Sequence, residues 1–230
     1  MDNNVDIQYF NDHKVWADLD GIQGIGFDEN ENIVYGNPEH ADLAKLIKLM
    51  IEYEKPGSNH RLLDRQIQKI KESHPDYHVV GKEKPLEYYR IIDVTKQIND
   101  IMIDAEKKYA DYYYLSNTVK YLKYLTLVGP KMKYDLKEKD EFLKHSLYIY
   151  DGEIVDRDVL GNIVYGYLGK VMGIAEIPMY AVPGIEQIVK GTSDISWYHS
   201  YFDDPRDQVR IKQGADIYDY WHQGQTRKYL

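Results

Sequence analysis

The chain has 230 residues, a net charge of −9 and a hydrophobic fraction of 43%, which is sufficient for a sizeable core. It contains no cysteine, which excludes disulfides, thiol catalysis and cysteine-based zinc sites. It also has no run of eighteen apolar residues, the length that would predict a membrane-spanning helix. The negative charge argues against nucleic-acid binding through the overall field of the protein, although a local basic groove would still permit it.

The start of the chain carries no visible signal peptide, because Met1 is followed by Asp-Asn-Asn rather than by a basic and apolar leader. Secretion then requires another route, or the sequence is part of a longer chain. Tyrosine supplies 23 of the 30 aromatic residues. This gives amphipathic surface suited to sugars or to a membrane interface, and it is equally what an AT-rich genome encodes.

The first half of the chain predicts helices and one β-hairpin. Two short apolar segments, 25–27 and 33–35, flank a turn-rich segment and predict the hairpin. Apolar periodicity predicts helices over 38–55 and 61–73, and the polar, proline-broken segment 76–92 is expected to be a loop. We interpret these segments as scaffold, without chemistry of their own.

Further helical patterns start near Asp93 and near Asn117, the latter ending at Gly129-Pro130. If residues 161–173 are helical, Asn162, Tyr165 and several glycines share one face. Glycine costs about 1 kcal/mol relative to alanine in a helix, so such a stripe indicates close helix packing or, less commonly, close approach of a ligand. The expected fold is mainly α: a single helical domain over 1–230 with a small β-hairpin near the N-terminus.

The stretch from Ser200 to Gln208 concentrates charge before the last predicted helix, which continues to about Trp221. Asp204 is a good N-cap, Pro205 suits the first helical position, and Asp207 stands where a capping-box acid would stand. Helix initiation alone therefore explains Asp204. Asp203 is superfluous to capping, which favours a functional site.

Aspartates in this stretch supply the hard oxygen ligands that Ca²⁺ and Mg²⁺ prefer. A helix N-terminus is positive, so a cation directly over it is disfavoured, and Asp203 and Asp207 are better candidates than Asp204. Asp135 and Asp158 are possible further members of the site. A bound cation would offset the charge of a diphosphate while Arg206 or Lys137 holds another oxygen.

Two of the eight histidines, His199 and His222, are near this acidic stretch in the sequence, and either could act as a general base. A histidine without catalytic function, in the core or on the surface, is the commoner interpretation of each. The sequence contains no His-Glu-x-x-His zinc signature, nucleophile elbow, Walker loop or dinucleotide fingerprint.

Three sequence blocks in order resemble the toxin domain called polymorphic toxin type 44. They are Gly129-Pro130 through Lys137, Gly161-Asn162-x-x-Tyr165-Gly166-x-x-Gly169, and Asp203-Asp204-Pro205-Arg206-Asp207-Gln208. The resemblance covers about residues 117–222, the expected catalytic portion, and leaves 1–115 as a helical scaffold portion. The sequence departs from the family pattern at one position of the first block. Gly-Pro-Trp is common there in the family, whereas Lys131 follows Gly129-Pro130 in this chain.

The resemblance implies an antibacterial toxin domain at the end of a secreted LXG protein of a type VII secretion system. Similarity to lipid II phosphatases of this kind implies a metal-dependent hydrolase that cleaves the phosphate linkage of lipid II at the outer face of the target membrane. The implied cofactor is Ca²⁺, with Mg²⁺ as the alternative, bound by Asp203, Asp204 and Asp207. The implied partners are lipid II or undecaprenyl diphosphate and a cognate immunity protein, with peripheral membrane contact and no nucleic acid.

Two hypotheses assign the catalytic residues differently. In the lipid II hydrolase, Asp135 or His199 activates water while Arg206 and Lys137 hold phosphate. The alternative is an intracellular RNase that uses no metal, and its catalytic set would be Lys137, Asn162, Tyr165 and His222. The cellular compartment separates them, because a nuclease kills from the cytoplasm and a lipid II hydrolase from outside.

Overall fold

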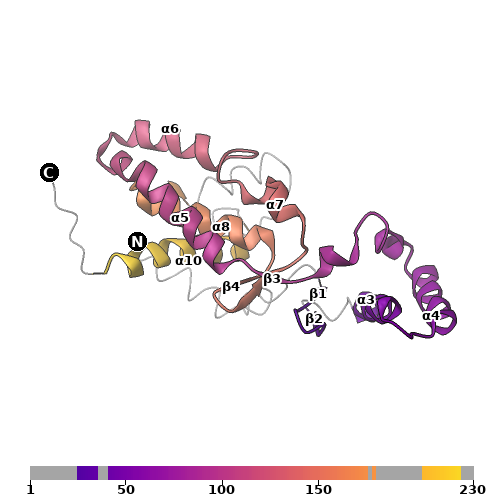
Figure 1. Ribbon diagram of the computed structural model, residues 1–230. Helices are drawn as coiled ribbons and strands as arrows, with labels where there is room; N and C mark the ends of the chain where they lie inside the picture. Colours follow the sequence, from indigo (N-terminus) through magenta and orange to yellow (C-terminus); the bar gives the residue numbers. More distant parts are fainter. Residues whose placement is uncertain (1–24, 36–40, 176–177, 180–203, 224–230) are drawn as a thin grey trace. The chain divides into compact units, whose positions relative to one another are not determined.

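The structure is a computed structural model that describes residues 25–35, 41–175, 178–179 and 204–223 (Figure 1). Most of these residues are helical, which confirms the mainly α fold class predicted from the sequence. None of the helices in these ranges is both long enough and apolar enough to cross a membrane. His199 and Asp203 lie outside the described residues.

The chain divides into two compact units, each made of segments distant in sequence. Among the described residues, we call those of 25–95 with 140–157 the mixed unit, and those of 96–139 with 158–223 the helical unit. The single domain over 1–230 stays a prediction, and the two units do not follow its division into a 1–115 scaffold portion and a 117–222 catalytic portion. The helix that begins at Thr95 belongs almost entirely with the segments of the expected catalytic portion.

The mixed unit begins with the predicted hairpin, in which β1 (Ile25–Phe27) pairs antiparallel with β2 (Ile33–Tyr35). The Asp28 carboxylate closes the turn by accepting hydrogen bonds from the backbone of Asn30 and Asn32 at 2.9 and 2.8 Å. The predicted helical pair follows as α3 (Ala41–Glu54) and α4 (His60–Ser73). Both helices and the hairpin contribute to one apolar core that includes Ile25, Phe27, Leu46, Ile47 and Ile70.

A second sheet in the mixed unit was not predicted. Its strand order is β3 (Ile92–Asp93), β4 (Tyr148–Tyr150) and β5 (Glu153–Val155), with β3–β4 parallel and β4–β5 antiparallel. Asp151 and Gly152 connect β4 to β5 with φ values of 50° and 80°, the left-handed conformation that a two-residue hairpin turn requires. The acidic segment after Tyr150 is therefore partly a turn. Short helical segments complete the unit: η2 (Pro75–Val79), η3 (Leu86–Tyr89) and α7 (Asp140–Leu143).

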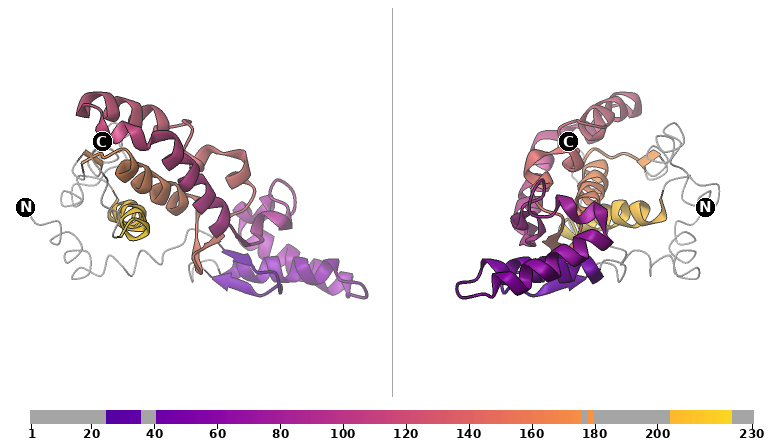
Figure 2. Two further views of the ribbon diagram at one scale, coloured as in Figure 1. Left: turned by 60° about the vertical axis from the view of Figure 1, so that its left-hand side comes forward. Right: turned by 90° about the vertical axis from the view of Figure 1, so that its right-hand side faces the viewer.

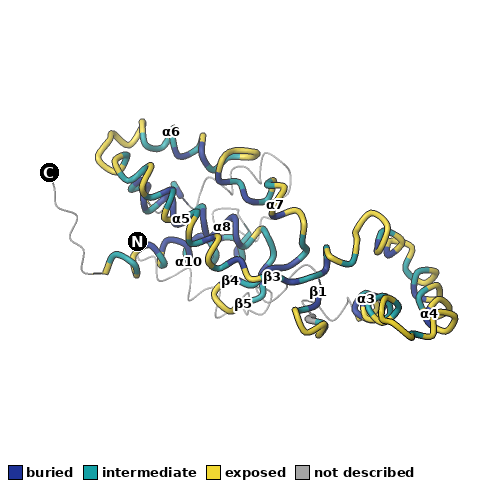
Figure 3. Tube along the Cα trace, viewed as in Figure 1, coloured by how far each residue is buried: buried dark blue, intermediate teal, exposed yellow. Residues whose placement is uncertain are grey.

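The helical unit is organised around α8 (Arg157–Val171), which is buried along most of its length (Figure 3). It lies between α5 (Thr95–Tyr109) and α10 (Pro205–Trp221), as the two views of Figure 2 show. Its remaining described elements are η4 (Ala110–Tyr114), α6 (Asn117–Val128) and η5 (Leu136–Glu138). The Tyr124 hydroxyl of α6 donates to the backbone oxygen of Tyr165 on α8 at 3.0 Å, so α6 is also held against α8.

Two glycines let α8 and α10 meet backbone to backbone. A Cβ atom at Gly166 would lie 1.8 Å from the carbonyl oxygen of Ile211, and one at Gly214 would lie 1.9 Å from that of Ile163. Neither position can hold a larger residue unless the helices separate. The glycine stripe of α8 therefore serves helix packing here, the commoner of the two interpretations of the sequence pattern.

We expect Gly166→Ala to lower the free energy of unfolding by about 3 kcal/mol or more, because the added methyl group collides with the backbone of α10. Gly161→Ala, on the same helix, is the matched control: its Cβ would only touch Lys137 Cγ at 3.4 Å. Helix propensity predicts that this control stabilises by up to about 1 kcal/mol. Urea denaturation of both variants checks the prediction, and equal effects would contradict it.

Candidate functional site

Asp207, on the first turn of α10, faces Asn162 of α8. The Asn162 Nδ2 donates to Asp207 Oδ1 at 2.6 Å, and Asn162 is only 8% exposed. Four residues further along each helix, Gly166 meets Ile211, so α8 and α10 run in the same direction along this contact. The backbone contact between the helices thus sets the position of the Asn162–Asp207 pair.

Burial raises the pKa of Asp207 to about 6. The charge of Lys137 opposes this rise in pKa, the carboxylates of Asp204 and Asp158 add to it, and the hydrogen bond from Asn162 opposes it. A carboxyl with a pKa near neutrality exchanges its proton within the working range of most enzymes. Asp207 therefore has the property expected of a general base or acid.

Lys137, in η5, brings a positive charge to this carboxyl. Its side chain lies across the start of α8, where a Cβ at Gly161 would be 3.4 Å from Lys137 Cγ and 3.5 Å from Cε. We call Lys137, Asp158, Asn162 and Asp207 the Asp207 cluster. It combines a proton-exchanging carboxyl, an amide that holds it and a cation suited to a phosphate oxygen.

Asp204 has a different environment from Asp207. It is the N-cap of α10, and its Oδ1 accepts a hydrogen bond from the backbone N–H of Arg206 at 2.9 Å. The Arg206 side chain returns to the same carboxylate, with Nη2 2.7 Å from Oδ2 and Nε 3.1 Å from each oxygen. The Asp204 and Arg206 side chains thus bind each other at the start of α10. The position of Asp204 as N-cap agrees with the capping interpretation of the sequence.

The described residues do not by themselves form a metal site. No group of three or more His, Asp or Glu side chains in the described ranges is arranged to hold an ion. Carboxylate oxygens suit Ca²⁺, but the Asp204 carboxylate is paired with Arg206 and that of Asp207 lies beside the Lys137 cation. The metal assignment stays a prediction that depends on Asp203, and no chemical step below is assigned to a metal.

Two further predicted residues make hydrogen bonds that fix the backbone. Asp135 Oδ2 accepts from the backbone N–H of Lys131 at 2.6 Å, which closes a turn in which Lys131 has a φ of 61°. The Tyr165 hydroxyl donates to the carbonyl oxygen of Met179 at 3.1 Å. Of the predicted catalytic residues, Lys137 and Asn162 contribute to the pKa of Asp207, and both lower it.

His222 belongs to a second polar cluster at the C-terminal end of α10. Its Nε2 is 2.7 Å from Glu106 Oε1, its Nδ1 is 2.7 Å from the Tyr218 carbonyl oxygen, and the Tyr167 hydroxyl donates to Glu106 Oε2 at 2.8 Å. Fifteen residues of helix at 1.5 Å each separate His222 from Asp207 by about 22 Å. Sequence reasoning missed Glu106, because it lies 116 positions before His222 on α5.

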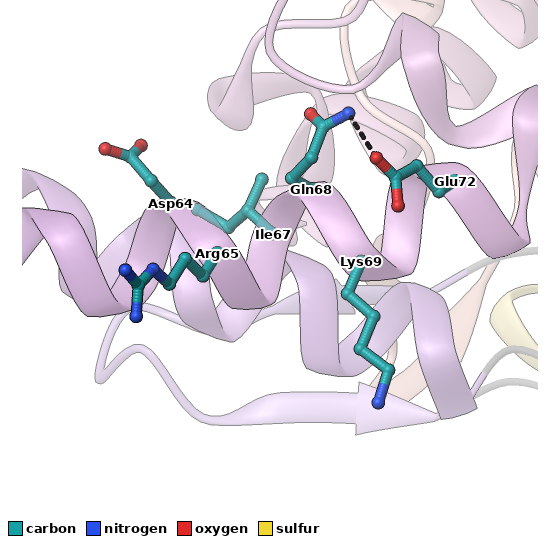
Figure 4. A pocket seen from close by; sticks show the side chains of 6 residues that line it. All are labelled: Asp64, Arg65, Ile67, Gln68, Lys69 and Glu72. Carbon is teal, nitrogen blue, oxygen red and sulfur yellow. Dashed lines mark hydrogen bonds between the residues drawn. The ribbon is translucent and has the colours of Figure 1, made fainter.

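A hollow on α4 in the mixed unit is a weaker candidate for a site. Figure 4 shows that its lining consists of consecutive turns of one helix: Asp64, Arg65, Ile67, Gln68, Lys69 and Glu72. The Gln68 Nε2 donates to Glu72 Oε1 at 3.0 Å, the usual i to i+4 pairing on a helix surface. A single exposed helix face cannot enclose a ligand, so we assign no function to this hollow.

The fold and the Asp207 cluster define a mainly α domain with a partly buried, proton-exchanging carboxyl between two helices. Residues 123–220 match the model of the family described as Bacterial toxin 44. The matched segment contains η5, α8 and most of α10, and therefore every member of the Asp207 cluster. The match supports a toxin domain in this part of the chain. The searches of curated proteins and of solved structures found no match.

We expect Asp207→Asn to stabilise the protein at pH 7, because it removes a partly buried charge while the amide oxygen can still accept from Asn162. The pKa of this carboxyl is raised by folding, so its contribution to stability falls as pH rises from about 4 to about 6. The shift corresponds to about 3 kcal/mol. The variant should lose this pH dependence, measured by urea denaturation at pH 4, 5, 6 and 7.

Asp216→Asn is the control for this prediction, since Asp216 lies on the same helix and pairs with Lys212 at 2.6 Å in an exposed setting. It should change stability by less than about 1 kcal/mol and leave the pH profile intact. A stability difference between the wild type and Asp207→Asn that does not change between pH 4 and 6 would contradict the assigned environment of Asp207.

Proposed function

We propose that this chain is an antibacterial toxin domain that hydrolyses the phosphate linkage of lipid II and so blocks peptidoglycan synthesis. The family match over residues 123–220 supports the toxin assignment. The choice of lipid II follows the resemblance of the three sequence blocks described above. The observation that carries the hydrolytic chemistry is the environment of Asp207, a carboxyl of raised pKa with a neighbouring cation and a fixed hydrogen-bond donor.

In the proposed reaction Asp207 is the general base. At pH 7 its carboxylate form predominates, and it takes a proton from the water that attacks phosphorus. The bond between phosphorus and the leaving oxygen breaks as the new phosphorus–oxygen bond forms. Asn162 holds Asp207 in position, and the Lys137 ammonium balances negative charge on the phosphoryl oxygens.

The proposed setting is the outer face of the target cell membrane, where a secreted toxin arrives. Delivery by a type VII system as part of an LXG protein remains part of this proposal, as does a cognate immunity protein. Ca²⁺, with Mg²⁺ as the alternative, is proposed as the cofactor. A cation would help to neutralise the diphosphate of the substrate.

The geometry favours this function over the RNase alternative. The RNase set requires His222 to act together with Lys137 and Asn162. These two residues lie beside Asp207, however, and His222 is about 22 Å from Asp207 along α10. The His222 ring is also paired with Glu106, so its position is explained by the second cluster. The net charge of −9 disfavours RNA as well.

We expect the purified chain to convert lipid II to products with a changed phosphate count, and Asp207→Asn to lower the rate at least a hundredfold. Since Asp207 must be ionised to act as a base, kcat/KM should fall below about pH 6. Mass spectrometry of the undecaprenyl products checks both points. Lys137→Ala should raise KM and lower kcat, because the cation contacts the phosphoryl group in both states.

Asp216→Asn and His222→Gln are the controls, and both should keep wild-type turnover when assayed as folded protein. EDTA tests the cofactor, with activity restored by added Ca²⁺ if the metal prediction is correct. Lipid II that stays intact under all conditions would refute the proposal. Degradation of total RNA that is lost in His222→Gln would support the alternative.

A further inference from the structure

The helical unit exposes an unusual number of large apolar side chains over a short segment. Most of the exposed large apolar residues in the described ranges fall between positions 103 and 132, on α5, η4, α6 and the turn after α6. Within positions 103–132 the most exposed are Leu122 at 60%, Tyr114 at 56% and Val119 at 48%. Val119 and Leu122 lie three residues apart on α6, opposite the buried Tyr124 and Leu127, so they share its outer face.

The same segment is strongly basic within an acidic protein. Six lysines and a single acid, Asp111, occur from Lys107 to Lys133, whereas the whole chain has a net charge of −9. Two acids just before this segment, Asp104 and Glu106, offset part of the charge; Asp104 pairs with Lys108 at 2.7 Å, and Glu106 pairs with His222. An excess of positive charge remains at 107–133.

The lysines and tyrosines form one connected surface rather than separate features. Lys120 Nζ lies 5.6 Å from the centre of the Tyr113 ring, and both Lys123 and Lys133 lie within 6 Å of the Tyr109 ring centre. These contacts join the end of α5, η4, α6 and the following turn. We call this part of the chain the η4–α6 surface; it comprises the exposed residues Tyr113, Tyr114, Leu115, Val119, Leu122 and Met132, with the exposed or partly exposed lysines from 107 to 133.

We propose that the η4–α6 surface binds the protein to an anionic phospholipid bilayer. Tyrosine rings favour the headgroup level of a membrane, and lysines beside them reach the lipid phosphates while their alkyl stems cover apolar surface. The protruding Leu122 and Val119 enter the acyl boundary. Each lysine near an anionic membrane surface strengthens binding about fivefold.

Charge complementarity indicates which part of the protein would face an anionic bilayer. A protein of net charge −9 is repelled by an anionic surface unless a basic region faces it, and residues 107–133 are such a region. The proposal extends the proposed function, because contact through this surface would bring a hydrolase of lipid II to the membrane that contains its substrate. The inference that the protein binds a bilayer rests on the η4–α6 surface and does not depend on the hydrolase activity.

Vesicle sedimentation tests this inference, with phosphatidylglycerol vesicles compared to phosphatidylcholine vesicles, both free of lipid II. We expect the wild-type chain to bind the anionic vesicles at least tenfold more tightly, and 0.5 M salt to reduce this binding at least tenfold. Tyr114→Ser/Leu122→Gln should weaken binding at least tenfold, because it removes two apolar side chains from the contact. Lys120→Gln/Lys123→Gln should weaken binding to the anionic vesicles at least tenfold and leave binding to the phosphatidylcholine vesicles unchanged.

Leu62→Gln/Tyr220→Ser is the matched control, since Leu62 and Tyr220 are also exposed, at 52% and 70%, but lie on other helices. It should bind as the wild type does. A wild type that binds neither vesicle, or η4–α6 variants that bind unchanged, would overturn the inference and indicate a protein partner for this surface. Because the vesicles lack lipid II, a failure to bind them does not affect the hydrolase proposal. Conversely, a protein that binds the vesicles but does not cleave lipid II refutes the hydrolase proposal and leaves the membrane inference intact.

Discussion

The candidate site depends on the backbone contact between α8 and α10. Gly166 and Gly214 lie at this contact, and each faces a carbonyl oxygen of the other helix at a distance that leaves no room for a side chain. The close approach fixes both the separation and the relative register of the helices. As a result Asn162 is in reach of Asp207, one turn before Gly166 meets Ile211. A sequence with larger residues at the two glycines would keep both helices but lose this pairing.

The charges at the start of α10 are divided into two environments. Asp204 and Arg206 neutralise each other and satisfy the helix terminus, so they contribute to folding. Asp207 is desolvated beside two other carboxylates, an arrangement that opposes folding at neutral pH and is offset only in part by Lys137 and Asn162. Groups held in such unfavourable environments are concentrated at functional sites. This contrast between two neighbouring aspartates is why Asp207, rather than the whole acidic stretch, is assigned the chemistry.

Local signals predicted much of the fold. The hairpin at 25–27 and 33–35, and helix boundaries such as those of α6 and α10, follow from turn residues, N-caps and proline, which act over a few positions. The Asp151-Gly152 turn has a local signal of the same kind in its glycine, but it was not predicted from the sequence. The pairs Asn162–Asp207 and Glu106–His222 join residues 45 and 116 positions apart, so they depend on helix packing that no local pattern encodes. The sequence indicated a chemical role for Asp135, which stays a prediction; the structure adds a turn-closing hydrogen bond that was not foreseen from the sequence.

The most direct test is an NMR titration of the Asp207 side-chain carboxyl carbon, assigned by comparison with Asp207→Asn. The packing of α8 against α10 predicts a midpoint near pH 6, well above that of an exposed aspartate. It also predicts that Gly166→Ala, which forces the helices apart, moves the midpoint toward the ordinary value. A wild-type midpoint near pH 4 would contradict the assignment, because Asp207 would then be an ordinary solvated carboxylate.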